Sequence, residues 1–154
     1  MNDAISHKPL AISQKSDPFL ADELDERRIG VMVKFWVEGA EEAWEIAQAL
    51  DKNKKYSYAL FFCHLALEKQ IKAVVVRVVR KPPIPSHDLV RLLKMLGIEL
   101  NDSQKAELKE VNSFNLEARY DDYKRQFYLK ATKEYTEKWM KKCEEYLIWL
   151  KEKI

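Results

Sequence analysis

Apolar residues recur at steps of three and four along most of the chain, which is the spacing of one buried face of a helix. The clearest stripe consists of Val33, Trp36, Val37, Ala40, Trp44, Ala47 and Leu50. It predicts a first long helix that begins at about Gly30 and ends in the polar run of residues 51–55. Residues 1 to about 28 lack such a stripe. We expect them to be an extension, flexible or docked, whose deletion leaves the fold intact.

A second long helix is predicted from about Lys54 to Arg80. Its first half, Ala59 to Leu67, is apolar around most of its circumference, which is typical of a central helix packed on several sides. The run Val74 to Val79 is rich in β-branched residues that favour strands. We still predict a helix, because at 100° per residue the basic side chains of this segment would lie on one face, within an arc of about 140° around the helix axis. They are Lys69, Lys72, Arg77 and Arg80.

The prolines at 82, 83 and 85 must end this helix, since proline removes a backbone donor and restrains the residue before it. Ser86 is then predicted to be the N-cap of a third helix that reaches Leu96, with Asp88 in its first turn and Gly97 closing it.

The cap-forming run of residues 101–103 predicts a fourth helix that ends at about Leu116. A loop from Glu117 to about Ala131 follows, and Thr132 opens the last helix. The predicted fold is all-α, an up-and-down bundle of four long helices plus one shorter helix over residues 29–154, preceded by the extension of residues 1–28.

Composition narrows the possible functions. The 154 residues carry 27 Lys and Arg against 25 Asp and Glu, so a site for a polyanion must be a local patch. Cys63 and Cys143 lack the spacing of metal ligands, which indicates buried reduced thiols in a cytoplasmic protein with no metal site and no cofactor. The chain shows neither a signal peptide nor a stretch long enough to span a bilayer.

Arg119, Tyr120, Asp121, Asp122 and Tyr123 bring a guanidinium, two phenols and two carboxylates into one short stretch. Arg119 could bind a phosphate through its planar fork of donors, while Tyr120 and Tyr123 could stack on a base. The alternative is a structural ion pair between Arg119 and one of the two aspartates.

Other polar positions are open to two interpretations. His87, followed by Asp88, could face an anion at the start of the third helix or make a capping contact. His64 shares a helix face with Glu68, and we expect it to be a structural histidine because one His/Glu pair is weak evidence for a metal. The basic residues of the second helix form either a phosphate-tracking surface or a solvated face.

Three segments, Ser57 to Lys69, Ser86 to Leu89 and Glu117 to Tyr123, resemble in their order the HEPN family of small helical bundles. The resemblance covers roughly residues 30 to 154. It implies a homodimer that binds nucleotide or nucleic acid, and a partnership with a minimal nucleotidyltransferase in a two-gene module of toxin-antitoxin type. It also selects the ligand-binding residues, which are Arg119, Tyr120, Tyr123, His87 and Asp88.

Catalytic members of that family cleave RNA without metal, using an arginine followed a few residues later by a histidine. Arg119 matches the arginine, but Lys124, Arg125 and Gln126 stand where the histidine is expected. Arg80 and His87 show a similar spacing across the proline-rich connection, away from the motif position, and we treat that match as chance. Two alternatives therefore stay open: an RNase toxin with an atypical proton donor such as Tyr123 or a histidine from elsewhere, and a dimerisation module without ligand.

Overall fold

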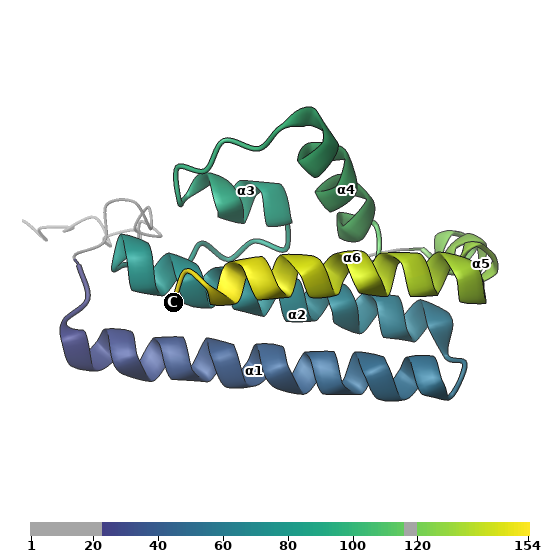
Figure 1. Cartoon of the computed structure of the whole chain (residues 1–154), viewed down its shortest axis with the longest axis horizontal. Coiled ribbons are helices and arrows are strands. Elements are labelled where there is room, and N and C mark those ends of the chain that lie inside the picture. The colour runs from purple at the N-terminus through teal and green to yellow at the C-terminus, as the bar shows by residue number, and fades with distance from the viewer. Residues whose placement is uncertain (1–22, 116–119) are drawn as a thin grey trace, which may run out of the picture.

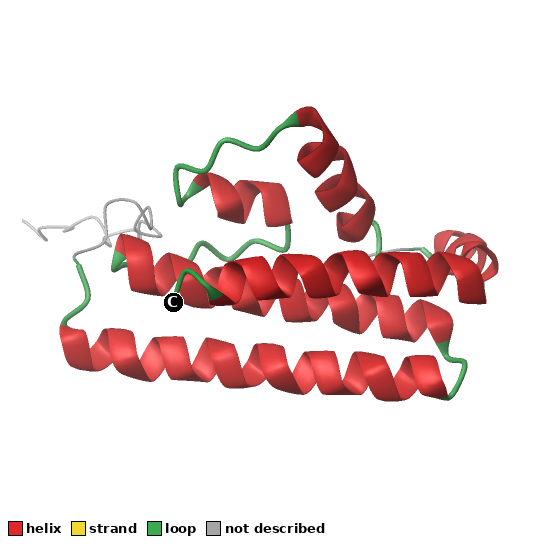
Figure 2. Cartoon of the chain, in the orientation of Figure 1, coloured by secondary structure: helices red, strands yellow, loops and turns green. Residues whose placement is uncertain are grey.

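The computed structural model describes residues 23–115 and 120–154, and all regular structure in these ranges is helical (Figure 2). The helices are α1 (Glu26–Lys52), α2 (Tyr56–Val79), α3 (Leu89–Lys94), α4 (Asp102–Asn112), α5 (Asp121–Lys130) and α6 (Lys133–Lys151). The predicted all-α fold is confirmed. Within the described ranges three helices are long and three are short, in place of the predicted four and one.

The three long helices, α1, α2 and α6, lie side by side, with α2 packed against both of the others (Figure 1). The chain direction in α2 is opposite to that in α1 and the same as that in α6 (Figure 1). Leu60, Leu67 and Ile71 of α2 are fully buried, so the prediction of a central helix is confirmed. Val74 to Val76 are also fully buried in α2, which shows that packing outweighs their intrinsic preference for strands.

The short helices α3 and α4 pack on each other and against α2 (Figure 1). The predicted cap of α3 is wrong, because Asp88 and not Ser86 accepts hydrogen bonds from the backbone amides of Val90 and Arg91. The Ser86 hydroxyl instead accepts a hydrogen bond from the Asp88 amide, at 3.1 Å. This second contact fixes the backbone just before the N-cap Asp88, where His87 lies.

Helix α5 occupies most of the stretch that we expected to be a loop. Its start lacks a capping residue, since Tyr120 is the N-cap and forms no side-chain cap hydrogen bond, and only the acidic first turn of Asp121 and Asp122 marks it. Phe127 is its one buried residue, and its ring centroid lies 5.6 Å from that of Phe114, next to the end of α4. The predicted helix starts in the run of residues 101–103 and at Thr132 are confirmed, with Asn101 and Thr132 as the N-caps, while α4 ends at Asn112, before the predicted Leu116.

The first helix begins earlier than the apolar stripe indicates. Asp25 caps α1, and the Leu24 amide donates a hydrogen bond to the Arg80 carbonyl at the end of α2, at 2.8 Å. The Glu26 carboxylate also lies 2.6 Å from the Arg80 guanidinium. Residues 24–28 therefore belong to the bundle rather than to the extension, and residues 1–22 lie outside the described part of the chain.

We expect deletion of residues 1–22 to leave the melting temperature unchanged, because it removes none of these contacts. Deletion of residues 1–28 should lower it, since the loss of the Asp25 cap alone costs about 1 kcal/mol. Thermal unfolding of the two truncated proteins beside the full chain measures the difference. Equal melting temperatures for both would contradict the assignment of residues 24–28 to the bundle.

Candidate functional site

A charged pair lies almost completely buried on α2. The Glu68 and Lys72 side chains are 5% and 8% exposed, and their Oε1 and Nζ atoms are 2.7 Å apart. Burying two charges costs desolvation energy, which a single contact rarely offsets. Further partners are present: Lys72 Nζ lies 5.1 Å from the centre of the Trp36 ring, and the second Glu68 oxygen lies 3.0 Å from His87 Nδ1.

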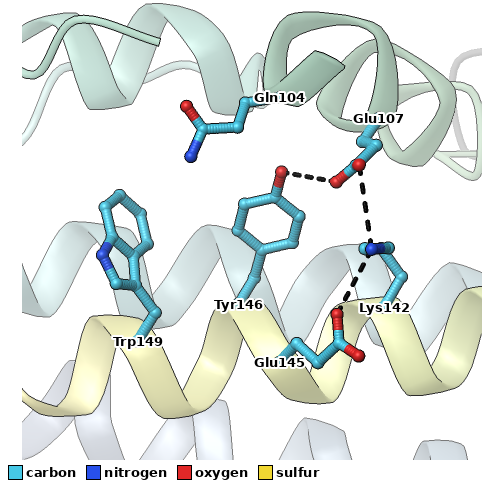
Figure 3. Close-up of a pocket in the computed structure, with 6 residues that line it drawn as sticks. All are labelled: Gln104, Glu107, Lys142, Glu145, Tyr146 and Trp149. Atoms are coloured by element: carbon cyan, nitrogen blue, oxygen red, sulfur yellow. Dashed lines mark hydrogen bonds and ion pairs between the residues drawn. The ribbon is translucent and has the colours of Figure 1, made fainter. Parts of the chain in front are cut away.

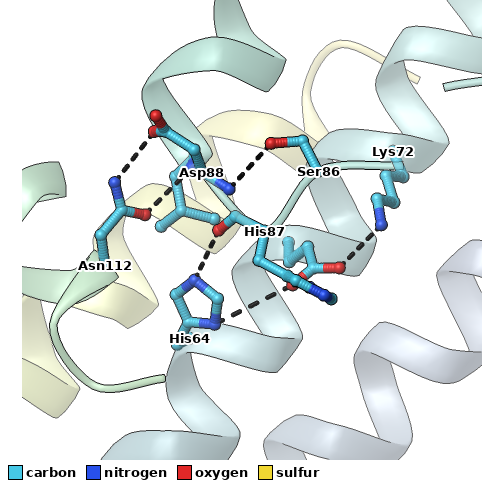
Figure 4. Close-up of polar contacts among 8 residues, drawn as sticks. His64, Lys72, Ser86, His87, Asp88 and Asn112 are labelled. Atoms are coloured by element: carbon cyan, nitrogen blue, oxygen red, sulfur yellow. Dashed lines mark hydrogen bonds and ion pairs between the residues drawn. The ribbon is translucent and has the colours of Figure 1, made fainter. Parts of the chain in front are cut away.

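His87 connects this buried pair with the surface (Figure 4). Its side chain is 67% exposed although Nδ1 contacts the buried Glu68 carboxylate. When Nδ1 carries the proton and donates it to Glu68, Nε2 of the neutral ring is left as an acceptor. A histidine oriented by a carboxylate in this way is suited to bind a ligand proton or to exchange one.

The Glu68 carboxylate remains charged. Burial alone raises its pKa, but the hydrogen bonds from Lys72 and His87 outweigh burial, so that the pKa lies below the ordinary value. The negative charge that orients His87 is therefore present at neutral pH.

His64 holds the backbone of the same site. It is fully buried, and its Nε2 donates a hydrogen bond to the His87 carbonyl oxygen at 2.9 Å. Burial lowers the pKa of His64, and the nearby Glu68 carboxylate offsets this only in part, so the imidazole is neutral at pH 7. The geometry agrees with the structural role predicted for His64.

The C-terminal end of α4 contacts both predicted parts of the site, the segment around His87 and Asp88 and the segment that contains Tyr123. Asn112 accepts a hydrogen bond from the Leu89 amide and donates one to Asp88 Oδ1, both at 3.0 Å (Figure 4). The next residue, Ser113, accepts a hydrogen bond from the Tyr123 hydroxyl through its carbonyl oxygen, at 3.2 Å. Consecutive residues thus anchor the start of α3 and the first turn of α5.

The structure places the predicted site residues in different environments. His87 is oriented and exposed, whereas Asp88 and Tyr123 make structural hydrogen bonds at the ends of α3 and α4. Tyr120 is 90% exposed at the start of α5, so its ring is accessible. Arg119 lies outside the described residues.

Glu68, Lys72 and Asn112 were not predicted as site residues. Opposite charges four residues apart within a mostly apolar helix are a signal of a buried ion pair, and this signal was available for Glu68 and Lys72. No feature of the sequence indicated a role for Asn112. The predicted basic stripe of α2 does not form one surface, because Lys72 is buried and Arg80 pairs with Glu26.

A shallow hollow of about 210 Å³ lies between α4 and α6 (Figure 3). The Tyr146 hydroxyl donates a hydrogen bond to Glu107 at 2.7 Å, and Lys142 lies 3.7 Å from Glu107 and 3.2 Å from Glu145. Burial and the Glu107 carboxylate raise the pKa of Tyr146. Since these polar groups satisfy one another, we interpret the hollow as a structural contact between the two helices.

The described residues contain neither the pattern of a metal site nor that of a membrane-spanning helix. In residues 23–115 and 120–154, no three His, Cys, Asp or Glu side chains are grouped so as to hold a metal ion. Over the same ranges, no helix is long and apolar enough to cross a membrane.

Comparison with known proteins gives a family and a related fold. The model of the HEPN domain family matches residues 33–154. The crystal structure of TT1696 from Thermus thermophilus is similar to this chain with a TM-score of 0.66 and 19% identity, over 79% of this chain and 98% of that one. At this level of identity the likeness concerns the fold. A comparison with curated proteins finds no match.

Proposed function

Because the chain belongs to the HEPN domain family, we propose that it binds nucleotides or nucleic acid where the start of α3 meets the end of α4. One observation carries the proposal: the exposed His87 imidazole is oriented by a buried, charged Glu68. The proposed site consists of His87, Tyr120, Tyr123 and Arg119, and Asp88 supports it as the cap of α3.

Each side chain has a separate task in this proposal. The accessible Tyr120 ring stacks on a base, which requires no particular sequence. The Arg119 guanidinium binds a phosphate through two parallel hydrogen bonds. Asp121 and Asp122 are acidic residues in the first turn of α5, where they interact favourably with the helix dipole and disfavour a phosphate at that point.

RNA cleavage is the second candidate, and the His87–Glu68 pair favours it. Cleavage through the 2′-hydroxyl needs a group that exchanges a proton near neutral pH. No histidine follows Arg119 in the sequence, but His87 could supply this group from the start of α3 while Arg119 stabilises the phosphate. Tyr123 is less suited to donate a proton, because its hydroxyl already donates to the Ser113 carbonyl.

A finer proposal concerns the physiological partner. Membership of the HEPN family supports a partnership with a minimal nucleotidyltransferase in a two-gene module of toxin-antitoxin type. The identity of the neighbouring gene and co-purification of its product would test this.

Titration of the full chain with labelled single-stranded RNA and with mononucleotides tests the binding function. The same RNA, incubated with the protein in the presence of a chelator, tests cleavage. Binding without cleavage supports the first candidate, and cleavage that is lost in His87→Ala supports the second. Absence of both binding and cleavage would favour the third hypothesis, a dimerisation module without ligand.

We also propose that the chain forms a homodimer through α1 and α2. The apolar segment Ala59 to Leu67 of α2 is largely covered within the chain, since Ala59, Leu60 and Cys63 are fully buried. On α1, however, Val31 and Phe35 are each 64% exposed and lie four residues apart on one face. Large apolar side chains grouped on a surface commonly mark an interface.

Sedimentation at micromolar concentration is expected to show a dimer that Phe35→Glu converts to a monomer, because the change places a charge in an apolar contact. Tyr128 is similarly exposed on α5, so Tyr128→Glu is the matched control and should leave the dimer intact. A monomeric wild-type chain would refute the dimer. A dimer that survives Phe35→Glu would refute this interface.

A further inference from the structure

The exposed side of α1 carries a second stripe of residues, separate from the stripe that packs on α2. Its members recur at steps of three and four residues, and all of them are exposed: Arg28, Val31, Phe35, Glu38 and Glu42. At 100° per residue they fall within an arc of about 80° around the helix axis. A stripe this narrow is the pattern by which one helix packs along another.

Charge is divided along this side of α1. Two positive side chains, Arg27 and Arg28, precede the apolar pair Val31 and Phe35. Negative side chains follow the pair: Glu38, Glu41 and Glu42. A surface that is basic at one end, apolar in the middle and acidic at the other end is complementary to a second copy of itself that runs in the opposite direction.

Other charged groups near the stripe already have partners within the chain. Asp25 caps α1, and the Glu26 carboxylate lies 2.6 Å from the Arg80 guanidinium. Lys34 Nζ lies 3.7 Å from the Glu38 carboxylate, and an exposed pair of this kind contributes little. The Glu38 side chain is still 63% exposed, so it is accessible to a positive group from outside the chain.

The spacing of the stripe sets the register of such a pair of helices. Val31 and Phe35 each lie two residues from position 33, and Arg28 and Glu38 each lie five residues from it. A two-fold axis at this level brings Val31 against the partner's Phe35 and Arg28 against the partner's Glu38, and each contact occurs twice. A parallel copy would instead set like charges against each other, which is unfavourable.

The surface beside Val31 is hollowed where the partner's Phe35 would lie. The hollow measures about 520 Å³, and Arg28, Val31 and Met32 are among the residues that line it. An aromatic ring buries a large apolar area when it fills such a hollow, so this contact would supply most of the binding energy.

We propose that two copies of the chain join through antiparallel α1 helices, with the partner's Phe35 in the hollow beside Val31 and with reciprocal Arg28–Glu38 ion pairs. This inference rests on the homodimer proposed above and gives its orientation. Helices α3 and α4 lie on the other side of α2 from α1 (Figure 1). Both His87 sites therefore stay open in this dimer.

Reversing charges tests the orientation, because like charges in contact repel, whereas removal of an exposed ion pair changes little. Arg28→Glu sets carboxylates against each other, and Glu38→Arg does the same with guanidinium groups. Each change alone should weaken self-association at least about ten-fold. The double variant exchanges the two charges and should dimerise within about three-fold of wild type, since the opposite-charge contacts return.

Sedimentation of the full chains over a concentration series measures these differences. Lys105→Glu reverses an exposed charge on α4 and is the matched control, which should dimerise like wild type. A monomeric wild type would refute the homodimer together with its orientation. If wild type is a dimer, unchanged self-association of Arg28→Glu, or failure of the double variant to recover it, would overturn the antiparallel contact alone.

Discussion

Replacing Glu68 with alanine is expected to destabilise the fold by about 3 to 5 kcal/mol. The variant leaves the Lys72 ammonium buried without its carboxylate at 2.7 Å, and it also removes the partner of His87 Nδ1. An uncompensated buried charge is far more costly than a lost surface contact. Chemical denaturation of wild type and Glu68→Ala measures the difference.

Two comparisons isolate the buried charge as the cause. Glu38 pairs with Lys34 at the same helical spacing on the exposed face of α1, so Glu38→Ala should stay within about 0.5 kcal/mol of wild type. The double change Glu68→Leu and Lys72→Met removes both charges, and it should recover most of the lost stability. A double variant as unstable as Glu68→Ala would show that the pair is not the source of the loss.

The effect of Glu68 should depend on pH. Its pKa is lower in the folded chain than in the unfolded chain, so its stabilising contribution is complete above the unfolded value, near 4.5. That contribution is lost as the pH falls through the lower folded pKa. The gap in stability between wild type and Glu68→Ala should therefore be constant near neutral pH and narrow in acid.

The long helices could be predicted because their apolar stripes are set by packing on one central element. The same signal failed for α5, where Phe127 is the single buried residue and Tyr120 provides no cap hydrogen bond. The ten residues of α5 place only two rings against the core, Tyr123 and Phe127, and one such pair is too short a pattern to predict a helix. Tertiary contact with Phe114 favours this helix, and such a contact is not local in sequence.

The geometry of the candidate site was also beyond prediction from the sequence where it depends on contacts between distant segments. His87 could be selected from the sequence through the resemblance to the HEPN family and its place beside Asp88, ahead of the predicted third helix. Its orientation could not be predicted, since it depends on Glu68, which lies nineteen residues earlier on another helix. The connection between α3 and α5 likewise forms at the end of α4, through the Asn112 side chain and the Ser113 carbonyl oxygen. Polar contacts between distant segments leave no periodic trace in a single sequence.

Arg119 carries the second large expected effect, on binding rather than on stability. If its guanidinium contacts a phosphate, Arg119→Ala removes a charge-assisted interaction worth roughly 1.5 to 3 kcal/mol. This corresponds to a loss of about ten-fold to a hundred-fold in affinity. Arg119→Lys should restore only part of the affinity, because an ammonium keeps the charge and loses the bidentate geometry. Arg125 is exposed on α5, and Arg125→Ala is the matched control for a nearby positive charge.

The most direct test of nucleotide or nucleic-acid binding is a titration of wild type and these three variants with single-stranded RNA and mononucleotides, with melting curves in parallel. We predict that Arg119→Ala loses affinity, Arg119→Lys regains part of it, Arg125→Ala changes little, and all four proteins melt together. Unchanged binding by Arg119→Ala together with a large drop in its melting temperature would contradict the account, because Arg119 would then be a structural ion-pair residue.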